Sequence, residues 1–326
     1  MAPWAVKPGI IPLRPLTLSD IFNGAVGYIR ANPKATLGLT AMVVVLMQII
    51  SLAATLGPLA AYDRTATQRP GELSSGVVGT LLTSLGAGVL VTWLGATLLS
   101  GMLTVIVGRA VFGSPITVSE TWAKIRGRIP ALLGLALLEA AAVAAVVGLF
   151  VVIVAMIAAV GGPAAAVLLG FPLLAVMFAV MAYLYTVVLF APVLIVLERL
   201  PVIDAITRSF ALVRNSFWRV FGIRLLTFVV ATVVADAVAA PFSIGGQLML
   251  SGAASINAVL IGTTIASIGT AIGQIITAPF NAGVIVLLYT DRRMRAEAFD
   301  LVLQTGAAGG PYATESTDYL WLRRPV

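Results

Sequence analysis

The sequence predicts an all-α integral membrane protein with six transmembrane helices, and three observations carry this prediction. Of the 326 residues, 60% are hydrophobic and only 10% are charged, whereas soluble domains carry about 25% charged residues. Four runs of 28 residues or more hold at most one charge each, and about 20 apolar residues suffice to cross a bilayer as a helix. Glycine and proline signals, at which a chain can turn, interrupt the longest runs.

The first two spans each correspond to one uncharged run. Lys34 and Asp63 are separated by 28 uncharged residues, which predicts one span. The run from Leu73 to Gly108 has 36 residues, about 54 Å of helix at 1.5 Å per residue. That length exceeds one bilayer core of ~30 Å but falls short of two spans and a turn. We therefore expect a single long or tilted helix.

The two remaining runs are each long enough for two spans. The 58 residues of 140–197 carry no charge, and Gly161-Gly162-Pro163 supplies the break between spans three and four. Only Asp236 interrupts the stretch from Leu225 to Thr290. The turn between spans five and six is predicted at a proline and two pairs of small residues, namely Pro241, Gly245-Gly246 and Ser251-Gly252.

The basic residues predict the orientation of the chain. Lys and Arg accumulate on the cytoplasmic side of membrane proteins. With the N-terminus inside, 18 of the 20 basic residues fall on the inner side, and only Arg64 and Arg69 fall in an outer loop. We therefore predict a multi-pass protein of a bacterial plasma membrane, with both termini cytoplasmic.

A polar segment precedes each pair of spans, and the three segments share a pattern. Thr17 and Thr117 each stand three residues before an acid, a capping-box spacing that starts a helix. Pro201 stands where the start of a helix tolerates proline. Apolar residues follow at intervals of three or four, with basic residues between them. Such amphipathic helices lie in the headgroup plane of an anionic leaflet, so the lipids of the inner leaflet are predicted partners.

This pattern divides the chain into three repeats of an interfacial helix followed by a transmembrane hairpin. An N-terminal cytoplasmic segment precedes the repeats, and a flexible cytoplasmic tail follows them. The boundaries in order are 1–16, 17–112, 113–199, 200–300 and 301–326. The alternative is that the polar segments are ordinary inner loops whose helical spacing is accidental.

The residue types that the chain lacks exclude most catalytic chemistry. There is no His and no Cys, which excludes Cys/His zinc motifs, Ser-His-Asp and Cys-His nucleophiles, thiol redox chemistry and disulfides. The net charge of +7 is not clustered on a solvated domain, as nucleic-acid binding would require. We predict no catalytic residue, no cofactor, no metal site and no nucleic-acid partner.

Polar side chains inside the predicted spans are candidates for an intramembrane site. A charge there costs several kcal/mol unless it is paired or protonated. Glu139 and Arg224 are predicted at similar depths, and we hypothesise an ion pair between them, either as a gate in a transport path or, as we favour, as structural glue. Asp236 is predicted near the outer end of span five, as a solvated helix end or a vestibule ligand. Asn281 follows Pro279, which should kink the last span; it lines a path or, as we favour, shapes the bundle.

A second group of charged residues gathers at the cytoplasmic surface in this topology. Its members are Glu198, Arg199, Asp204, Arg208, Asp291, Arg292, Arg295, Glu297 and Asp300. The carboxylates could hold a divalent cation, but arginines stand among them, and we favour mutual salt bridges. In the last span, Gly269-x-x-x-Gly273 provides a small surface for close helix approach. We favour packing within the chain there over a homo-oligomer or another membrane-protein partner.

Short motifs spread over nearly the whole chain resemble the glycerophosphoryl diester phosphodiesterase membrane-domain family. They are the opening Leu13-Arg14-Pro15-Leu16-Thr17-Leu18-Ser19-Asp20, the central Arg208-Ser209-Phe210 with Ser216-Phe217-Trp218, and the closing segment from Tyr289 to Asp300. The resemblance implies a six-span fold in a stand-alone bacterial member. It does not carry the phosphodiesterase activity, because the soluble catalytic barrel of that family is missing and its site requires His.

Two functions from different classes follow as expectations. The leading one is a non-enzymatic membrane protein that assists or organises bacterial envelope and lipid processes and binds the anionic inner leaflet. The alternative is a transporter or lipid-translocating protein, whose second, fourth and sixth spans would surround a path near Glu139 and Arg224. Against the alternative, the chain lacks the dense set of intramembrane polar residues expected of an ion or sugar carrier.

Overall fold

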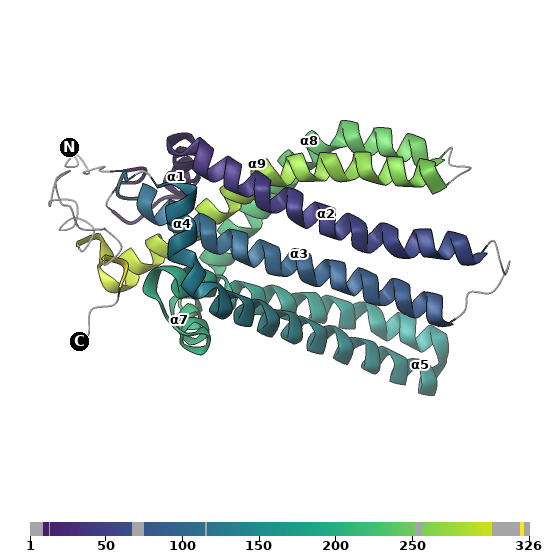
Figure 1. Cartoon of the computed structure of the whole chain (residues 1–326). Coiled ribbons are helices and arrows are strands. Elements are labelled where there is room, and N and C mark those ends of the chain that lie inside the picture. Colours follow the sequence, from purple (N-terminus) through teal and green to yellow (C-terminus); the bar gives the residue numbers. More distant parts are fainter. Residues whose placement is uncertain are drawn as a thin grey trace.

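The computed structural model of the chain consists of helices joined by short connections (Figure 1). It describes residues 9–12, 14–66, 75–114, 116–251, 256–301 and 320–322, and no strand occurs in these ranges. Residues 67–74, which include Arg69, lie outside the described residues, as do much of the predicted N-terminal segment (1–16) and most of the predicted tail (301–326).

The helix start predicted at Thr17 is confirmed. Helix α1 (Leu18–Ala31) is capped by Thr17, whose hydroxyl accepts a hydrogen bond from the backbone N–H of Asp20, while the Asp20 carboxylate accepts one from the N–H of Thr17. Helices α2 (Pro33–Ala66) and α3 (Ser75–Ala110) have 34 and 36 residues. The described part of the run that begins at Leu73 therefore forms one long helix, as the length of the run predicts.

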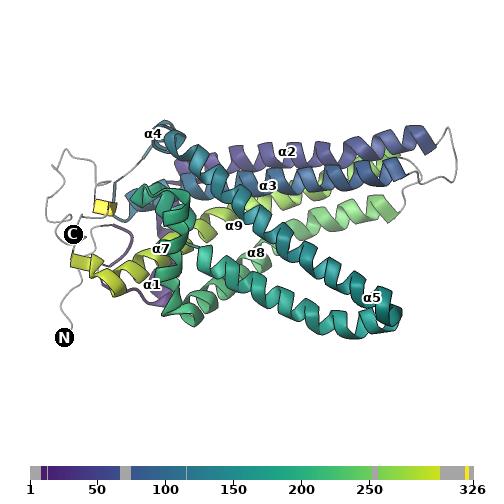
Figure 2. The same cartoon turned by 90° about the horizontal axis from the view of Figure 1, so that it is seen from below.

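The second set of helices begins with a second capping box. Thr117 and Glu120 cap α4 (Val118–Ile125) in the same way, and the short 3-10 turn η1 (Arg126–Arg128) leads into α5 (Ile129–Val188). Inside α5, Gly162 has φ of 77°, a conformation that glycine adopts without steric cost. At this residue α5 reverses its direction (Figure 2), so the predicted break at Gly161-Gly162-Pro163 is confirmed.

The third set follows a short irregular connection. The single turn α6 (Ala191–Val193) continues into the π-helical turn η2 (Leu194–Glu198), which ends at Arg199 with φ of 59°. Helix α7 (Val202–Arg214) starts directly after Pro201, as predicted. The chain continues into the long helices α8 (Phe217–Ser251) and α9 (Ile256–Glu297).

The turn between spans five and six is predicted at Pro241, Gly245-Gly246 and Ser251-Gly252. The first two signals are wrong, because α8 runs through both positions. Helix α8 ends at Ser251, the first residue of the third signal, and Gly252 lies outside the described residues. The small residues serve packing instead. A Cβ atom on Gly246 would lie 2.5 Å from the carbonyl oxygen of Gly262 in α9. The glycine thus allows the two helices to approach closely.

The predicted glycine motif of α9 also faces α8. A Cβ atom on Gly269 would lie 2.5 Å from Phe242, and one on Gly273 would lie 2.9 Å from the carbonyl oxygen of Ala235. In the described chain the motif therefore packs two helices of one molecule together.

The short helices gather at one end of the molecule, and the long helices extend from that end (Figures 1 and 2). Helix α2 pairs with α3 and α8 with α9, and the two legs of α5 form a third hairpin. This third hairpin contacts α3 and α7 and diverges from α8 and α9 (Figure 2).

Five helical stretches of the described chain are long and apolar enough to cross a membrane. They are Pro33–Ala54, Gly86–Ala110, Val118–Leu197, Phe217–Ser251 and Asn257–Glu297. The third stretch contains both legs of α5. Away from the short helices, large apolar side chains are exposed, including Val160 at 91% and Phe171 at 77%. Exposed apolar surface on this scale is typical of contact with lipid rather than with water.

The buried core lies at the end that carries the short helices. Tyr28, Phe190, Tyr289 and Phe299 are fully buried there. Trp321, close to the C-terminus, is also buried, and its ring lies 5.4 Å from that of Phe299 and 6.4 Å from that of Tyr289, centroid to centroid.

Candidate functional site

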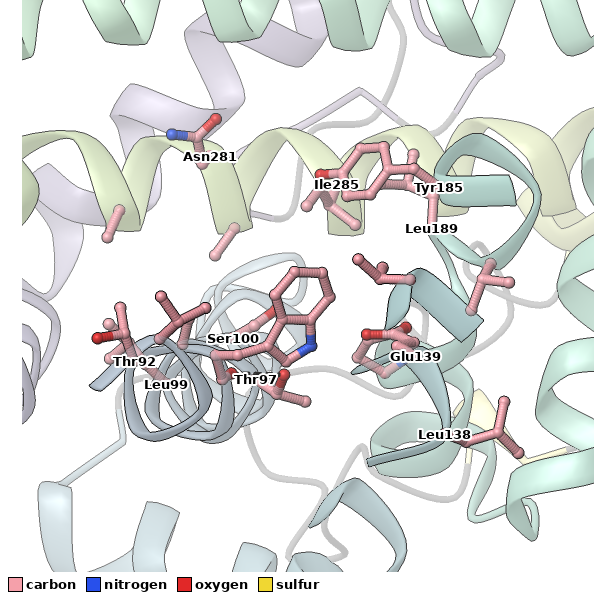
Figure 3. Close-up of a pocket in the computed structure, with 18 of the residues that line it drawn as sticks. Thr92, Thr97, Leu99, Ser100, Leu138, Glu139, Tyr185, Leu189, Asn281 and Ile285 are labelled. Carbon is pink, nitrogen blue, oxygen red and sulfur yellow. Dashed lines mark hydrogen bonds between the residues drawn. The ribbon is translucent and has the colours of Figure 1, made fainter. Parts of the chain in front are cut away.

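The long helices border a partly open cavity of about 900 Å³ next to the short helices. Its wall comes mainly from α3, both legs of α5 and α9, the helices that contain the predicted second, third, fourth and sixth spans. Figure 3 shows Asn281 and Ile285 on α9 in the upper part of the view, Thr92, Thr97 and Leu99 of α3 below them at the left, and Glu139 below them at the right.

Arg224 enters this cavity from α8 and is held by neutral partners. Its Nε and Nη2 atoms donate hydrogen bonds to the hydroxyl oxygen of Tyr185 over 3.0 and 2.8 Å, and its Nη1 atom donates to Oδ1 of Asn281 over 2.7 Å. The guanidinium carbon also lies 5.6 Å from the centre of the Tyr185 ring. Asn281 in turn donates to the carbonyl oxygen of Thr277 over 3.1 Å, which leaves its own amide oxygen oriented toward Arg224.

Glu139 lines the same cavity from the first leg of α5. The indole of Trp93 in α3 is its hydrogen-bonding neighbour. No ion pair joins Glu139 to Arg224 among the described residues, so the hypothesised direct pair is wrong. The reason is that Arg224 reaches Tyr185 on the second leg of α5 and Asn281 on α9, while Glu139 turns toward α3.

Asp236 does not belong to this site. It is exposed on α8, and no residue of the cavity wall is adjacent to it in the sequence. Because α8 continues for 15 residues beyond Asp236 before it ends at Ser251, the prediction that Asp236 stands near a helix end is also wrong. Of the four predicted intramembrane residues, the structure brings together Glu139, Arg224 and Asn281.

Most of the remaining cavity wall is apolar. Leu99, Leu103, Leu138 and Ile285 are among the residues that line it. The hydroxyls of Thr92 and Thr97 donate to the carbonyl oxygens one turn earlier in α3, over 2.9 and 3.0 Å, so their donors are used within the helix. The cavity thus combines a large apolar wall with one guanidinium and one carboxyl group.

Part of the predicted cytoplasmic charge cluster forms a buried network around Glu198. One carboxylate oxygen of Glu198 accepts a hydrogen bond from Tyr289 over 2.6 Å, and the other lies 2.6 Å from Nε of Arg208. Arg293 pairs with Glu198 over 3.6 Å. Arg208 and Arg293 both also pair with Glu297, over 2.7 and 3.1 Å. Burial alone would lower the pKa of Arg208, but the hydrogen bond and the charge of Glu198 outweigh it, so the pKa lies above its ordinary value.

A second network surrounds the buried Asp291. Its carboxylate pairs with Arg295 over 2.8 Å and with Arg219 over 3.4 Å, and it accepts a hydrogen bond from the backbone N–H of Leu16 over 2.9 Å. The same two arginines donate to the carbonyl oxygen of Leu16 over 3.0 and 3.1 Å. The backbone N–H of Leu16 is thus bound by Asp291, and its carbonyl oxygen is bound by Arg219 and Arg295.

The other members of the predicted cluster have different roles. Arg292 donates to the carbonyl oxygen of Leu212 over 3.3 Å. Within the described ranges, Arg199, Asp204 and Asp300 form no ion pair with a side chain. The described residues also contain no group of three acidic side chains arranged to hold a metal ion.

Sequence reasoning missed several residues of the cavity and of the two charged networks. Tyr185 and Trp93 fell inside apolar runs, where an aromatic residue carries no distinguishing pattern. Arg219 and Arg293 were visible only as charges near helix ends. The only sequence signal for Tyr289 was its place in the closing motif.

The long apolar helices place the chain in the class of all-α membrane proteins. It belongs to the family described as a domain of unknown function (DUF7847), which matches residues 16–292. This match shows no link to the glycerophosphoryl diester phosphodiesterase membrane-domain family that the motifs resemble. Neither a search of curated proteins nor a search of solved structures gave a match.

Proposed function

We propose that the chain is a non-enzymatic membrane protein that binds a membrane lipid in its intramembrane cavity and thereby assists envelope or lipid processes of a bacterial plasma membrane. In this proposal the chain crosses the membrane six times as three hairpins, because α5 reverses at Gly162. The end with the short helices, where the basic residues gather, faces the cytoplasm.

The short helices support contact with the inner leaflet. They and the first turn of α8 expose large apolar side chains at this end of the molecule, namely Leu18, Val118, Trp122, Ile203, Phe210 and Trp218. Basic side chains stand on the same helices, including Arg30, Lys124 and Arg214. Apolar side chains beside basic ones suit the headgroup region of an anionic leaflet.

The cavity is the observation that carries the proposal. Its volume of about 900 Å³ lies at the upper end of the range for small-molecule sites, roughly 300–1,000 Å³. An apolar wall beside a few convergent polar groups suits an amphiphile, whose chains occupy the apolar part and whose headgroup reaches the polar part.

Native mass spectrometry of the protein from mild detergent tests this proposal. The purified protein should retain a stoichiometric lipid. Ala142→Trp, which fills the cavity from its wall, should release it. Ala144→Trp is the matched control, because Ala144 is exposed on the same leg of α5 and does not line the cavity. Lipid retained equally by both variants, or by neither variant nor the parent, would overturn the proposal.

Translocation of lipid between leaflets is the second candidate function. The observation that favours it is the position of charged groups of both signs in a cavity between helices that cross the membrane, since polar residues there mark substrate paths. Proteoliposomes with a fluorescent phospholipid should then show exchange between leaflets that Ala142→Trp slows and Ala144→Trp does not. Exchange equal to that of protein-free vesicles would leave lipid binding without translocation.

A further inference from the structure

We infer that the cavity is selective for a lipid with a zwitterionic headgroup, whose phosphate binds Arg224 and whose primary ammonium binds Glu139. This inference rests on the proposed lipid binding and adds the chemistry of the headgroup. It comes from the charges that the cavity wall leaves uncompensated.

Arg224 supplies the binding site for the anion. A guanidinium has five N–H donors, and three are used by Tyr185 and Asn281. One N–H on each terminal nitrogen remains, and within the described chain no carboxylate neutralises the positive charge. Each of these two N–H groups can donate a charge-assisted hydrogen bond to a phosphate oxygen. Tyr185 and Asn281 fix the orientation of the guanidinium without cancelling its charge.

Glu139 supplies the complementary group. Its hydrogen-bonding neighbour Trp93 is neutral, and no basic side chain pairs with it among the described residues. A carboxylate has lone pairs for about four hydrogen bonds, so one indole donor leaves most of them for a ligand. A primary ammonium offers three N–H donors and a positive charge, whereas a quaternary ammonium offers no donor.

The two charges share one cavity and do not pair with each other. In its charged form, each therefore carries a desolvation cost of several kcal/mol in the membrane. An anionic ligand would compensate Arg224 alone, and a cationic ligand would compensate Glu139 alone. A headgroup with both charges compensates both, and its acyl chains match the apolar wall formed by Leu99, Leu103 and Leu138.

The test is competitive retention of three phospholipids with identical acyl chains. The purified protein is equilibrated with equimolar phosphatidylethanolamine, phosphatidylcholine and phosphatidylglycerol in detergent, and bound lipid is identified by native mass spectrometry. Phosphatidylethanolamine should exceed each of the others about tenfold, the ratio expected from one hydrogen bond between charged groups. Equal retention of the three lipids by the parent protein would overturn the inference while leaving lipid binding intact.

Variants then separate the two ends of the headgroup. Glu139→Gln should remove the preference for phosphatidylethanolamine over phosphatidylglycerol but still retain phospholipid. Arg224→Gln should lower retention of all three lipids. Asp236→Asn is the control, because it removes a carboxylate of α8 that lies outside the cavity, and its selectivity should equal that of the parent. Unchanged selectivity in Glu139→Gln would contradict the assignment of the ammonium.

Glycerophosphoethanolamine, the same headgroup without acyl chains, distinguishes a lipid from a soluble ligand. At millimolar concentration it should not displace the retained lipid. Displacement would mean that the site takes a soluble zwitterion. Absence of any retained lipid in the parent would instead overturn the proposed function itself.

Discussion

The hydroxyl of Tyr289 donates a hydrogen bond to Oε1 of Glu198 over 2.6 Å and so connects α9 to η2 across 91 positions of sequence. Both side chains are buried. The second oxygen of Glu198 lies 2.6 Å from Nε of Arg208, so three elements meet at one carboxylate. This network is one of two buried polar networks at the end where the core lies.

Neutralising Glu198 should therefore be costly. Because Arg208 and Arg293 would lose a buried partner, we expect Glu198→Gln to lower the free energy of unfolding by about 3 kcal/mol. Asp204→Asn is the matched control, since Asp204 is exposed and forms no ion pair in the described chain. Thermal unfolding in detergent measures both. Equal melting temperatures for the two variants would contradict the structural role of the network.

Tyr28 should make stability depend on alkaline pH. Its hydroxyl donates a hydrogen bond to the carbonyl oxygen of Pro279, and burial raises the pKa of Tyr28 well above its ordinary value of 10.0. In the unfolded chain Tyr28 ionises near pH 10, whereas in the folded chain it stays protonated. Its contribution to stability is thus fully present below pH 10 and is lost as the pH rises above it.

The Tyr28→Phe variant isolates this effect. At pH 7 it should be less stable than the parent by about 1 kcal/mol, the value of one hydrogen bond. Above pH 10 the parent should lose stability faster than the variant, so the difference between them should shrink. Melting temperatures from pH 7 to pH 11 provide the measurement, and parallel curves would show that Tyr28 is not the group responsible.

Two glycines should respond oppositely to alanine. A Cβ atom on Gly273 would lie 2.9 Å from the carbonyl oxygen of Ala235, whereas one on Gly245 would meet nothing within 4 Å. We expect Gly273→Ala to destabilise the protein by about 1–3 kcal/mol through overpacking. Gly245→Ala should be neutral or stabilise it by up to about 1 kcal/mol, because alanine favours the helix. A stabilising Gly273→Ala would mean that α8 and α9 separate more easily than their packing indicates.

The proposed orientation can be tested with single cysteines, because the chain contains none of its own. Ser119 in α4, Ala164 after the bend of α5 and Ile203 in α7 are all exposed. On intact cells, a membrane-impermeant maleimide should label Ala164→Cys, and it should label Ser119→Cys and Ile203→Cys only after permeabilisation. Labelling of all three from one side would contradict the two crossings by α5.

Local signals predicted much of the fold. The capping boxes at Thr17 and Thr117 and the reversal at Gly162 depend on neighbouring residues, and sequence spacing reports such features directly. Pro241 misled the prediction, because tolerance of a proline within a helix depends on what packs around it. The contact between Gly246 and Gly262 that accompanies the continuous α8 is a property of tertiary structure.

The candidate site was predictable in its composition but not in its pairing. The cost of burying a charge singled out Glu139 and Arg224, and the position after Pro279 singled out Asn281. All three line the cavity. Opposite charge and similar depth were insufficient to predict an ion pair, because rotation of each helix about its axis decides which neighbour a side chain reaches. Arg224 faces Tyr185, 39 residues away in sequence, and no spacing rule connects them.

The binding of Leu16 by Asp291 and Arg295 also constrains the order of events during synthesis. These partners follow Leu16 by 275 and 279 residues, so at 5–20 residues per second the ribosome needs roughly 14 to 55 s to supply the first of them. The backbone groups of Leu16 therefore stay hydrated, and these contacts do not form, until α9 has left the ribosome. In a nascent chain truncated before Asp291, the segment that precedes α1 would stay accessible to protease.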